Sequence, residues 1–237
     1  PDVTLRNVTS KGDLILDKGI GEGDVTLENV TVEGHTYVRG GGANSIHIIG
    51  GKYNNIFVEK SEGKVRVVAT NAEGVKVVLA TQSEDDDSEV ILEGSFDSVT
   101  VSAPEVKVTL QGTTTVKELV VAATATTATV NTTSTVTVEK ATVETKATFT
   151  GTGTIKEATG TAASETTYEK APEQITVTQP TEPVTPPVTG GGGGGGSTTL
   201  ALNSITLKFT NRDPITKNSD LSSPVINIDL SDIESSA

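Results

Sequence analysis

One phrase of the sequence occurs twice near the start of the chain, 22 positions apart. Residues 2–12 read DVTLRNVTSKG, and residues 24–34 read DVTLENVTVEG. The two copies agree at several positions, among them Leu5 and Leu27, Asn7 and Asn29, and Gly12 and Gly34. Self-similarity at a fixed period of about 20 to 50 residues is typical of architectures in which each repeat buries its apolar face only by stacking on its neighbours. We therefore expect a fold of stacked coils.

Each coil is expected to consist of β-strands. Short strand candidates recur about every ten residues from Val3 to Ile155, and Gly, Asn, Asp or Ser clusters separate most of them. No stretch has the 3.6-residue apolar period of a helix. At about 20 to 25 residues per coil, about seven or eight coils of a single-stranded parallel β-helix fit into residues 1 to about 165. A β-sandwich remains the alternative, because the repeat blurs after Gly63.

The stacking places matching residues above one another at about 4.8 Å, which is the spacing of strands in a sheet. Asn7 over Asn29 is then a side-chain ladder, and Gly12 over Gly34 is a column of turns. A right-handed coil is the common case for parallel crossovers. From about Thr113 the chain is almost entirely Thr, Val and Ala, so we expect narrower coils and a poorer core there.

The composition agrees with an all-β class and excludes some partners. Aromatic residues make up 3 % of the chain, and Trp, Met and Cys are absent, so the core must be built from Val, Ile, Leu, Ala and Thr. The formal charge of −13 opposes binding to nucleic acid and to anionic membranes. No run of 18 apolar residues is present to span a bilayer. Without Cys, thiol chemistry is excluded as well.

Three regions are expected along the chain. Residues 1–170 form the solenoid, with TQSEDDDSE at residues 81–89 looping out of the stack. Residues 171–197 form a linker, in which a Pro-Thr stretch is followed by seven consecutive Gly. Residues 198–237 form a C-terminal β-strand segment, either a strand donor or a fragment of a β-sandwich, because two or three strands do not easily build a core alone.

Several segments resemble a module of exported surface proteins of Firmicutes such as Paenibacillus and thermophilic clostridia, a module associated with S-layer homology repeats. The resemblance rests on GDVTLENVTVEGHTYVRGGGANSIHI at residues 23–48, on Val58–Lys60 with Gly63–Ala69, and on Gly94–Val101. It covers about residues 1–197 and implies a β-helix at the bacterial cell surface. S-layer homology repeats are absent from this chain, and the segment after the glycines is shorter than the sandwich domain of that pattern.

The residues offer little for catalysis. His35 and His47 are the only histidines, and half a coil separates them, so we expect them on different faces. Arg39 is expected near Asp17 and Glu59 on adjacent coils. That arrangement is a catalytic cluster if the protein is a polysaccharide lyase or hydrolase, whereas a charge ladder on a solvated face is the plainer interpretation.

Two kinds of ligand site deserve consideration. Tyr37 and Phe57 occupy equivalent strand positions in successive coils, with Tyr53 nearby. If they point outward they form an aromatic strip for a polysaccharide, and if they point inward, as we expect, they fill a core of small residues. The acidic residues Asp85, Asp86 and Asp87 offer hard oxygen ligands for Ca²⁺. They lack the spacing of a calcium loop, so a solvated acidic loop and no cofactor are expected.

The sequence leads to three functional hypotheses. The first is a non-catalytic structural subunit of an extracellular bacterial filament or surface layer. In it, copies of the chain assemble head-to-tail because the C-terminal strands dock on a neighbour, and no N-terminal cap is evident before the first strand. The expected assembly residues are Leu200, Leu202, Ile205, Leu207, Phe209, Ile226, Ile228 and Leu230. The second is a monomeric module that binds cell-wall or environmental polysaccharide, and the third is a β-helix lyase or hydrolase.

Overall fold

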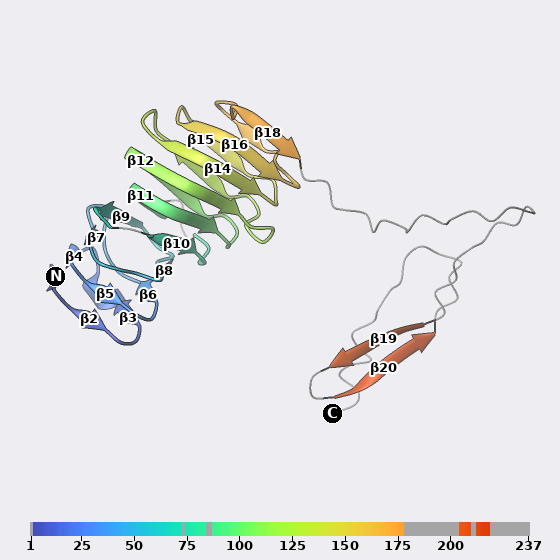
Figure 1. Cartoon of the computed structure of the whole chain (residues 1–237), viewed down its shortest axis with the longest axis horizontal. Coiled ribbons are helices and arrows are strands. Elements are labelled where there is room, and N and C mark those ends of the chain that lie inside the picture. The colour runs from blue at the N-terminus through green and yellow to red at the C-terminus, as the bar shows by residue number, and fades with distance from the viewer. Residues whose placement is uncertain (1, 73, 84–86, 178–203, 210–211, 219–237) are drawn as a thin grey trace, which may run out of the picture. The chain divides into compact units, whose positions relative to one another are not determined.

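A computed structural model describes residues 2–72, 74–83, 87–177, 204–209 and 212–218 of the chain. The described residues between 2 and 177 form a parallel β-solenoid of about eight turns, in which successive coils stack from β1 to β18 (Figure 1). All the pairings between the solenoid strands are parallel, which confirms the β-helix and excludes the β-sandwich. Within the described residues, no helix is long and apolar enough to span a membrane.

Two columns of strands run the length of the stack. The first column contains β1 (Val3–Arg6), β4 (Val25–Glu28), β7 (His47–Ile49), β9 (Lys64–Thr70), the starts of β11 (Glu89–Val101) and β12 (Lys107–Val121), β13 (Thr129–Thr132), β15 (Thr148–Gly151) and β17 (Thr167–Tyr168). The second contains β3 (Leu14–Leu16), β6 (Thr36–Val38), β8 (Asn55–Val58), β10 (Lys76–Leu79), the ends of β11 and β12, β14 (Thr137–Val143), β16 (Thr154–Gly160) and β18 (Gln174–Val177).

The first coils have a third, shorter face. It consists of β2 (Thr9–Ser10), which pairs with β5 (Thr31–Val32), and of Lys52, which bridges to Thr31. A short 3-10 turn, η1 (Lys18–Ile20), closes the first coil. In later coils one strand turns the corner without interruption, and β11 does so with a register shift between Glu93 and Ser95. Gly94 lies at this bend with φ +116°, and a Cβ there would stand 2.0 Å from the Ala69 carbonyl oxygen.

The repeat seen in the sequence is the register of the stack. Leu5 pairs with Leu27. Asn29 Nδ2 donates to Asn7 Oδ1 over 2.8 Å, and both Asn residues have positive φ, which Asn tolerates at a corner. The expected ladder at this corner is therefore confirmed. The turn column is confirmed as well, because the Gly34 amide donates to the Gly12 carbonyl over 3.2 Å.

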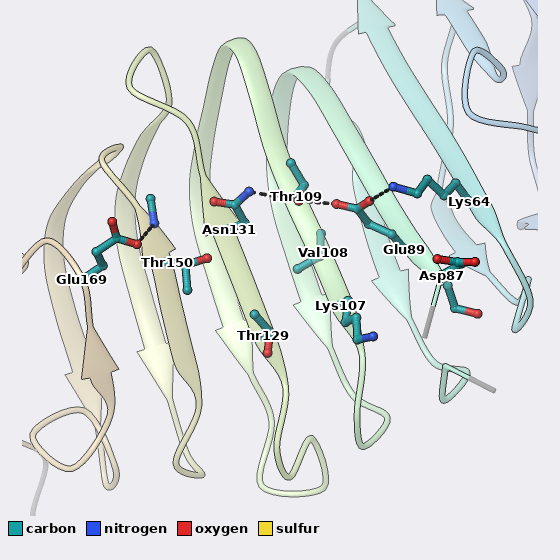
Figure 2. A pocket seen from close by; sticks show the side chains of 12 residues that line it. Lys64, Asp87, Glu89, Lys107, Val108, Thr109, Thr129, Asn131, Thr150 and Glu169 are labelled. Atoms are coloured by element: carbon teal, nitrogen blue, oxygen red, sulfur yellow. Dashed lines mark hydrogen bonds and ion pairs between the residues drawn. The ribbon is translucent and has the colours of Figure 1, made fainter. Parts of the chain in front are cut away.

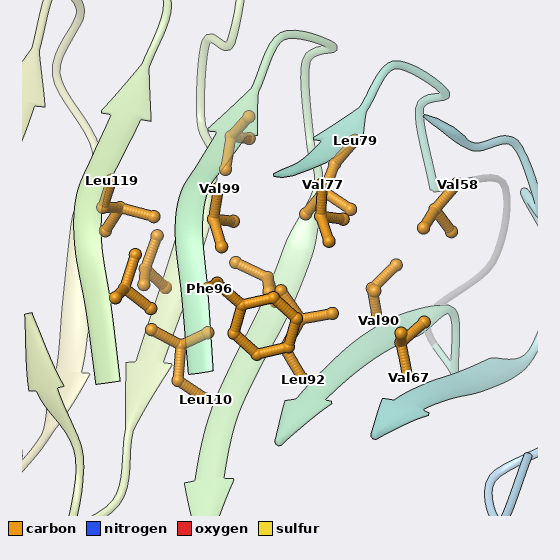
Figure 3. Packing of buried hydrophobic residues seen from close by; sticks show 14 of the residues in the cluster. Val58, Val67, Val77, Leu79, Val90, Leu92, Phe96, Val99, Leu110 and Leu119 are labelled. Carbon is orange, nitrogen blue, oxygen red and sulfur yellow. The ribbon is translucent and has the colours of Figure 1, made fainter. Parts of the chain in front are cut away.

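The core is a thin column of mostly aliphatic residues, and Phe96 and Phe149 are the most deeply buried of its few aromatic side chains. Inward positions alternate with outward ones along each strand, so Val77, Val99 and Leu119 lie above one another and are fully buried (Figure 3). Phe96 fills the middle of this layer and is 1 % exposed. Toward the C-terminus the inward row continues with Ala141 and Ala158, which are 17 positions apart. Because Leu119 and Ala141 are still 22 positions apart, the expected narrowing begins only with the last coils and not at Thr113.

The boundaries of the expected regions differ in part from the structure. β18 pairs with β16, so the solenoid extends beyond residue 170 into the segment assigned to the linker. The Pro-Thr composition obscured the alternating strand QITV at residues 174–177. The rest of the linker lies outside the described residues.

A second unit comprises Val184–Ala237. Its described part is one antiparallel pair, β19 (Ser204–Phe209) with β20 (Arg212–Asn218). β19 carries three of the expected assembly residues, Ile205, Leu207 and Phe209. The other five lie outside the described residues, namely Leu200, Leu202, Ile226, Ile228 and Leu230.

Candidate functional site

Ion pairs on the outer surface join neighbouring coils. Arg6 Nε lies 2.7 Å from Glu28, Lys64 Nζ 2.8 Å from Glu89, and Lys156 Nζ 2.7 Å from Glu139. The partners of each pair come from successive strands of the stack. Exposed pairs contribute little to stability individually, at about 0 to 1 kcal/mol each. Their common effect is to favour one register between coils.

Arg39 lies in such a ladder. Its Nε donates to Glu59 over 2.7 Å, and this hydrogen bond, with the negative charges of Glu59 and Asp17, raises the pKa of the guanidinium. The three residues expected together are therefore close. The Arg39 guanidinium is paired with Glu59 of the adjacent coil, an arrangement that matches the charge ladder expected from the sequence.

A groove of about 480 Å³ crosses several coils of the first column (Figure 2). Its polar side chains are hydrogen-bonded along the stack. Asn131 Nδ2 donates to Thr109 Oγ1 over 3.4 Å, Thr109 donates to Glu89 over 2.5 Å, and Lys64 pairs with the same carboxylate. Burial raises the pKa of Glu89, but the hydrogen bonds from Lys64 and Thr109 outweigh burial and hold it below its usual value. These groups bind one another across coils.

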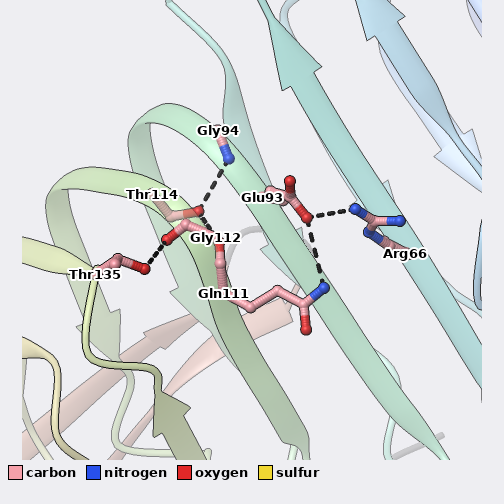
Figure 4. A network of polar contacts seen from close by, with 7 residues as sticks. All are labelled: Arg66, Glu93, Gly94, Gln111, Gly112, Thr114 and Thr135. Atoms are coloured by element: carbon pink, nitrogen blue, oxygen red, sulfur yellow. Dashed lines mark hydrogen bonds and ion pairs between the residues drawn. The ribbon is translucent and has the colours of Figure 1, made fainter.

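A second polar network surrounds the bend in β11 (Figure 4). Arg66 is hydrogen-bonded to Glu93, and Gln111 Nε2 lies 3.5 Å from the same carboxylate. The hydrogen bond from Arg66 lowers the pKa of Glu93. At the bend, the Gly94 amide donates to Thr114 Oγ1 over 3.0 Å. The network thus supplies hydrogen bonds where the main-chain ladder is interrupted, but Arg66 Nε is buried without a partner among the described residues.

Tyr37 and Phe57 form an aromatic stack on the outside of the second column. Their ring centroids are 5.4 Å apart at an interplanar angle of 15°. The expectation that both point inward is wrong, because Thr36 and Ile56, the preceding residues of these strands, occupy the core positions. Each ring turns one face to the other, and the Arg39 guanidinium lies 5.5 Å from the Tyr37 ring centroid. This leaves little ring face for a sugar.

The remaining residues singled out in the sequence are dispersed. Tyr53 is 6 % exposed, so the inward interpretation is confirmed for it. His47 lies in β7 of the first column, whereas His35 directly precedes β6 of the second, so the two are on different faces as expected. Asp85 and Asp86 lie outside the described residues. Asp87 is exposed, and no group of three or more acidic or His side chains that could hold a metal occurs in the described part of the chain.

The C-terminal end of the solenoid has a feature that the sequence analysis missed. Ile175 continues the inward row of Ala141 and Ala158, which are fully buried, yet it is 44 % exposed. Val177, which pairs with Gly160, is 48 % exposed. Among the described strands, β18 pairs only with β16. Its other edge and two core-type side chains are thus uncovered by described residues. The alternation of Ile175 and Val177 was the available signal.

Comparisons of the chain with known protein families, with curated proteins and with solved structures found no match. Functional inference therefore depends on the residues and on their geometry.

Proposed function

We propose that this protein is a non-catalytic structural subunit of an extracellular bacterial filament or surface layer. The observation that carries the proposal is the open β18 edge, where Ile175 and Val177 extend the core rows with no described residue above them. An unpaired strand edge with apolar side chains is a template for strand addition from another chain. Head-to-tail addition that does not close into a ring produces a filament.

The occupant that we assign to this edge is the C-terminal segment of another copy. Within the described residues of that segment, β19 and β20 pair only with each other. A two-stranded sheet is marginally stable alone, so the segment requires a further surface. Strand addition at β18 supplies both main-chain hydrogen bonds and an apolar contact. The Pro-Thr and Gly composition of the intervening chain suits a connection between subunits.

The side of the solenoid supports a structural role. Several of its charged groups are paired between coils, as in Arg39–Glu59 and Lys64–Glu89, and some of its Thr and Asn side chains bond along the stack. Such ladders stiffen a rod whose repeats otherwise contact only their neighbours. The acidic charge and the resemblance to exported surface modules are the reasons to place this rod at the bacterial cell surface.

The test is electron microscopy and sedimentation of four purified chains. They are the full chain, the chain ending at residue 189, Ile175→Lys and Ile49→Lys. Ile49 is the matched control, since it is 40 % exposed but belongs to β7 on the side of the stack. We expect filaments from the full chain and from Ile49→Lys, and single rods from the other two, with the circular dichroism of Ile175→Lys unchanged.

Any of three results contradicts the proposal or its docking site. Single rods from the full chain mean that the tail docks on its own solenoid or on a different partner. Filaments from the chain that ends at residue 189 mean that assembly does not use the tail. Filaments from Ile175→Lys, like those from the full chain, would mean that the tail docks at a surface other than β18.

A further inference from the structure

A small pocket of about 350 Å³ lies on the side of the stack, where the chain enters the second column. His35, Asn55 and Lys76 line it from three successive coils. Asn55 pairs with Lys76, and the residue after His35 pairs with the residue after Asn55, so the three occupy one outward row. Tyr53, in the turn before β8, and Asp97, in β11, complete the lining that the argument uses. These five residues therefore form a cluster of basic, acidic and neutral polar groups on one side of the stack.

Two polar atoms in this cluster are buried without a hydrogen-bond partner among the described residues. They are the Tyr53 hydroxyl and His35 Nδ1. Only 6 % of the surface of Tyr53 is exposed. Burial raises its pKa to about 12, so the phenol stays protonated and able to donate. Buried polar groups in folded proteins are nearly always hydrogen-bonded, and each exception calls for a partner.

The charges at the pocket favour a neutral ligand that both donates and accepts hydrogen bonds. Lys76 is exposed and has no ion-pair partner among the described residues, whereas Asp97 brings a carboxylate that is also bonded to Lys117. An anion is attracted by the Lys76 ammonium but repelled by the Asp97 carboxylate. A cation is attracted by the carboxylate but repelled by the ammonium. An apolar ligand leaves the Tyr53 and His35 atoms unpaired. Sugar hydroxyls satisfy both kinds of group.

We propose that the His35–Tyr53–Lys76 pocket binds one neutral sugar unit of a polysaccharide. Its volume lies at the small end of the range for ligand sites, which suits a single ring rather than a longer segment. The sugar hydroxyls pair with the Tyr53 phenol, with His35 Nδ1 and with the amide of Asn55. The site adjoins the Tyr37–Phe57 stack, because the His35 ring lies edge-on to Phe57 with ring centroids 5.4 Å apart, but the ring faces within that stack are turned to one another. It does not depend on assembly at β18.

The experiment is calorimetric titration of the full chain with neutral β-1,4-linked hexasaccharides of glucose, of mannose and of xylose, with hexagalacturonate as the charged comparator. Tyr53→Phe removes only the hydroxyl and should weaken binding about threefold to tenfold. Tyr168→Phe is the matched control. Its phenol is also buried, and burial raises its pKa to about 12, but it lies in β17 away from the pocket. That variant should bind like the wild type.

A second variant keeps the test decisive if Tyr53→Phe folds poorly. Lys76→Ala alters an exposed side chain, and we expect it to weaken binding while leaving thermal unfolding unchanged. The assembly-deficient Ile175→Lys chain should bind the saccharide normally, which separates this proposal from the structural role. The proposal is overturned if none of the neutral hexasaccharides binds, if only hexagalacturonate binds, or if Tyr53→Phe binds as tightly as the wild type.

Discussion

Replacing Phe96 by Ala tests the architecture most directly. Phe96 is 1 % exposed and lies between coils that are fixed by main-chain pairing on both sides (Figure 3). A buried Phe→Ala change costs about 3 to 5 kcal/mol, and the cost is highest where the surroundings cannot collapse into the cavity. Because the strands are held at a fixed spacing, we expect a loss of about 4 kcal/mol in the free energy of unfolding.

The matched control is the same substitution at Phe57. That side chain is half-buried on the outside and stacks on Tyr37. Loss of an aromatic pair costs about 0.5 to 1.5 kcal/mol beyond the area involved, so we expect about 1 to 2 kcal/mol in total. Urea unfolding followed by far-ultraviolet circular dichroism measures both variants, since the chain has no Trp. If Phe96→Ala costs no more than Phe57→Ala, the assignment of inward and outward positions is wrong.

Three further predictions follow from other parts of the solenoid. Gly94→Ala should lower the melting temperature sharply, because the added Cβ would lie 2.0 Å from a main-chain carbonyl oxygen. Gly12→Ala should change the melting temperature little, because no atom lies within 4 Å of the added Cβ. Equal effects of the two substitutions would contradict the geometry of the bend. Glu93→Gln should remove part of the acid limb of the stability profile. The folded pKa of Glu93 is lowered by Arg66, so its contribution to stability is present above the ordinary Glu pKa of 4.5 and is lost as the pH falls through the folded pKa. An unchanged acid limb in urea titrations would refute this. Tyr53 should ionise only near pH 12, because burial raises its pKa from 10 to about 12. Its contribution to stability is therefore fully present below pH 10 and is lost as the pH rises through 12. A tyrosinate difference titration against Tyr53→Phe that shows ionisation near pH 10 would refute this prediction.

The sequence by itself determined the architecture. Two similar phrases 22 residues apart carry matching apolar, Asn and Gly positions, and in-register parallel stacking is the arrangement that uses all three at once. The Asn7–Asn29 ladder was predictable because both partners lie in the repeated phrase. The position of Arg39 beside Glu59 was predictable for a similar reason, since both follow matching strands of adjacent coils.

Tertiary structure alone decided the partners and faces that depend on where each coil closes. Arg66 meets Glu93 at a separation of 27 residues. The insertion after residue 80 lengthens the register to 25, and Glu93 lies two residues beyond Ile91, the strand partner of Arg66. The face of Tyr37 and Phe57 depended on which neighbouring residues the core accepts, which local composition does not specify. The pocket at His35 and Tyr53 joins three coils, and the exposure of Ile175 depends on which strand ends the stack. The period of the sequence determines that the coils stack in register. The contacts between coils and the exposed end of the stack depend on the length of each coil and on the number of coils, which the period does not give.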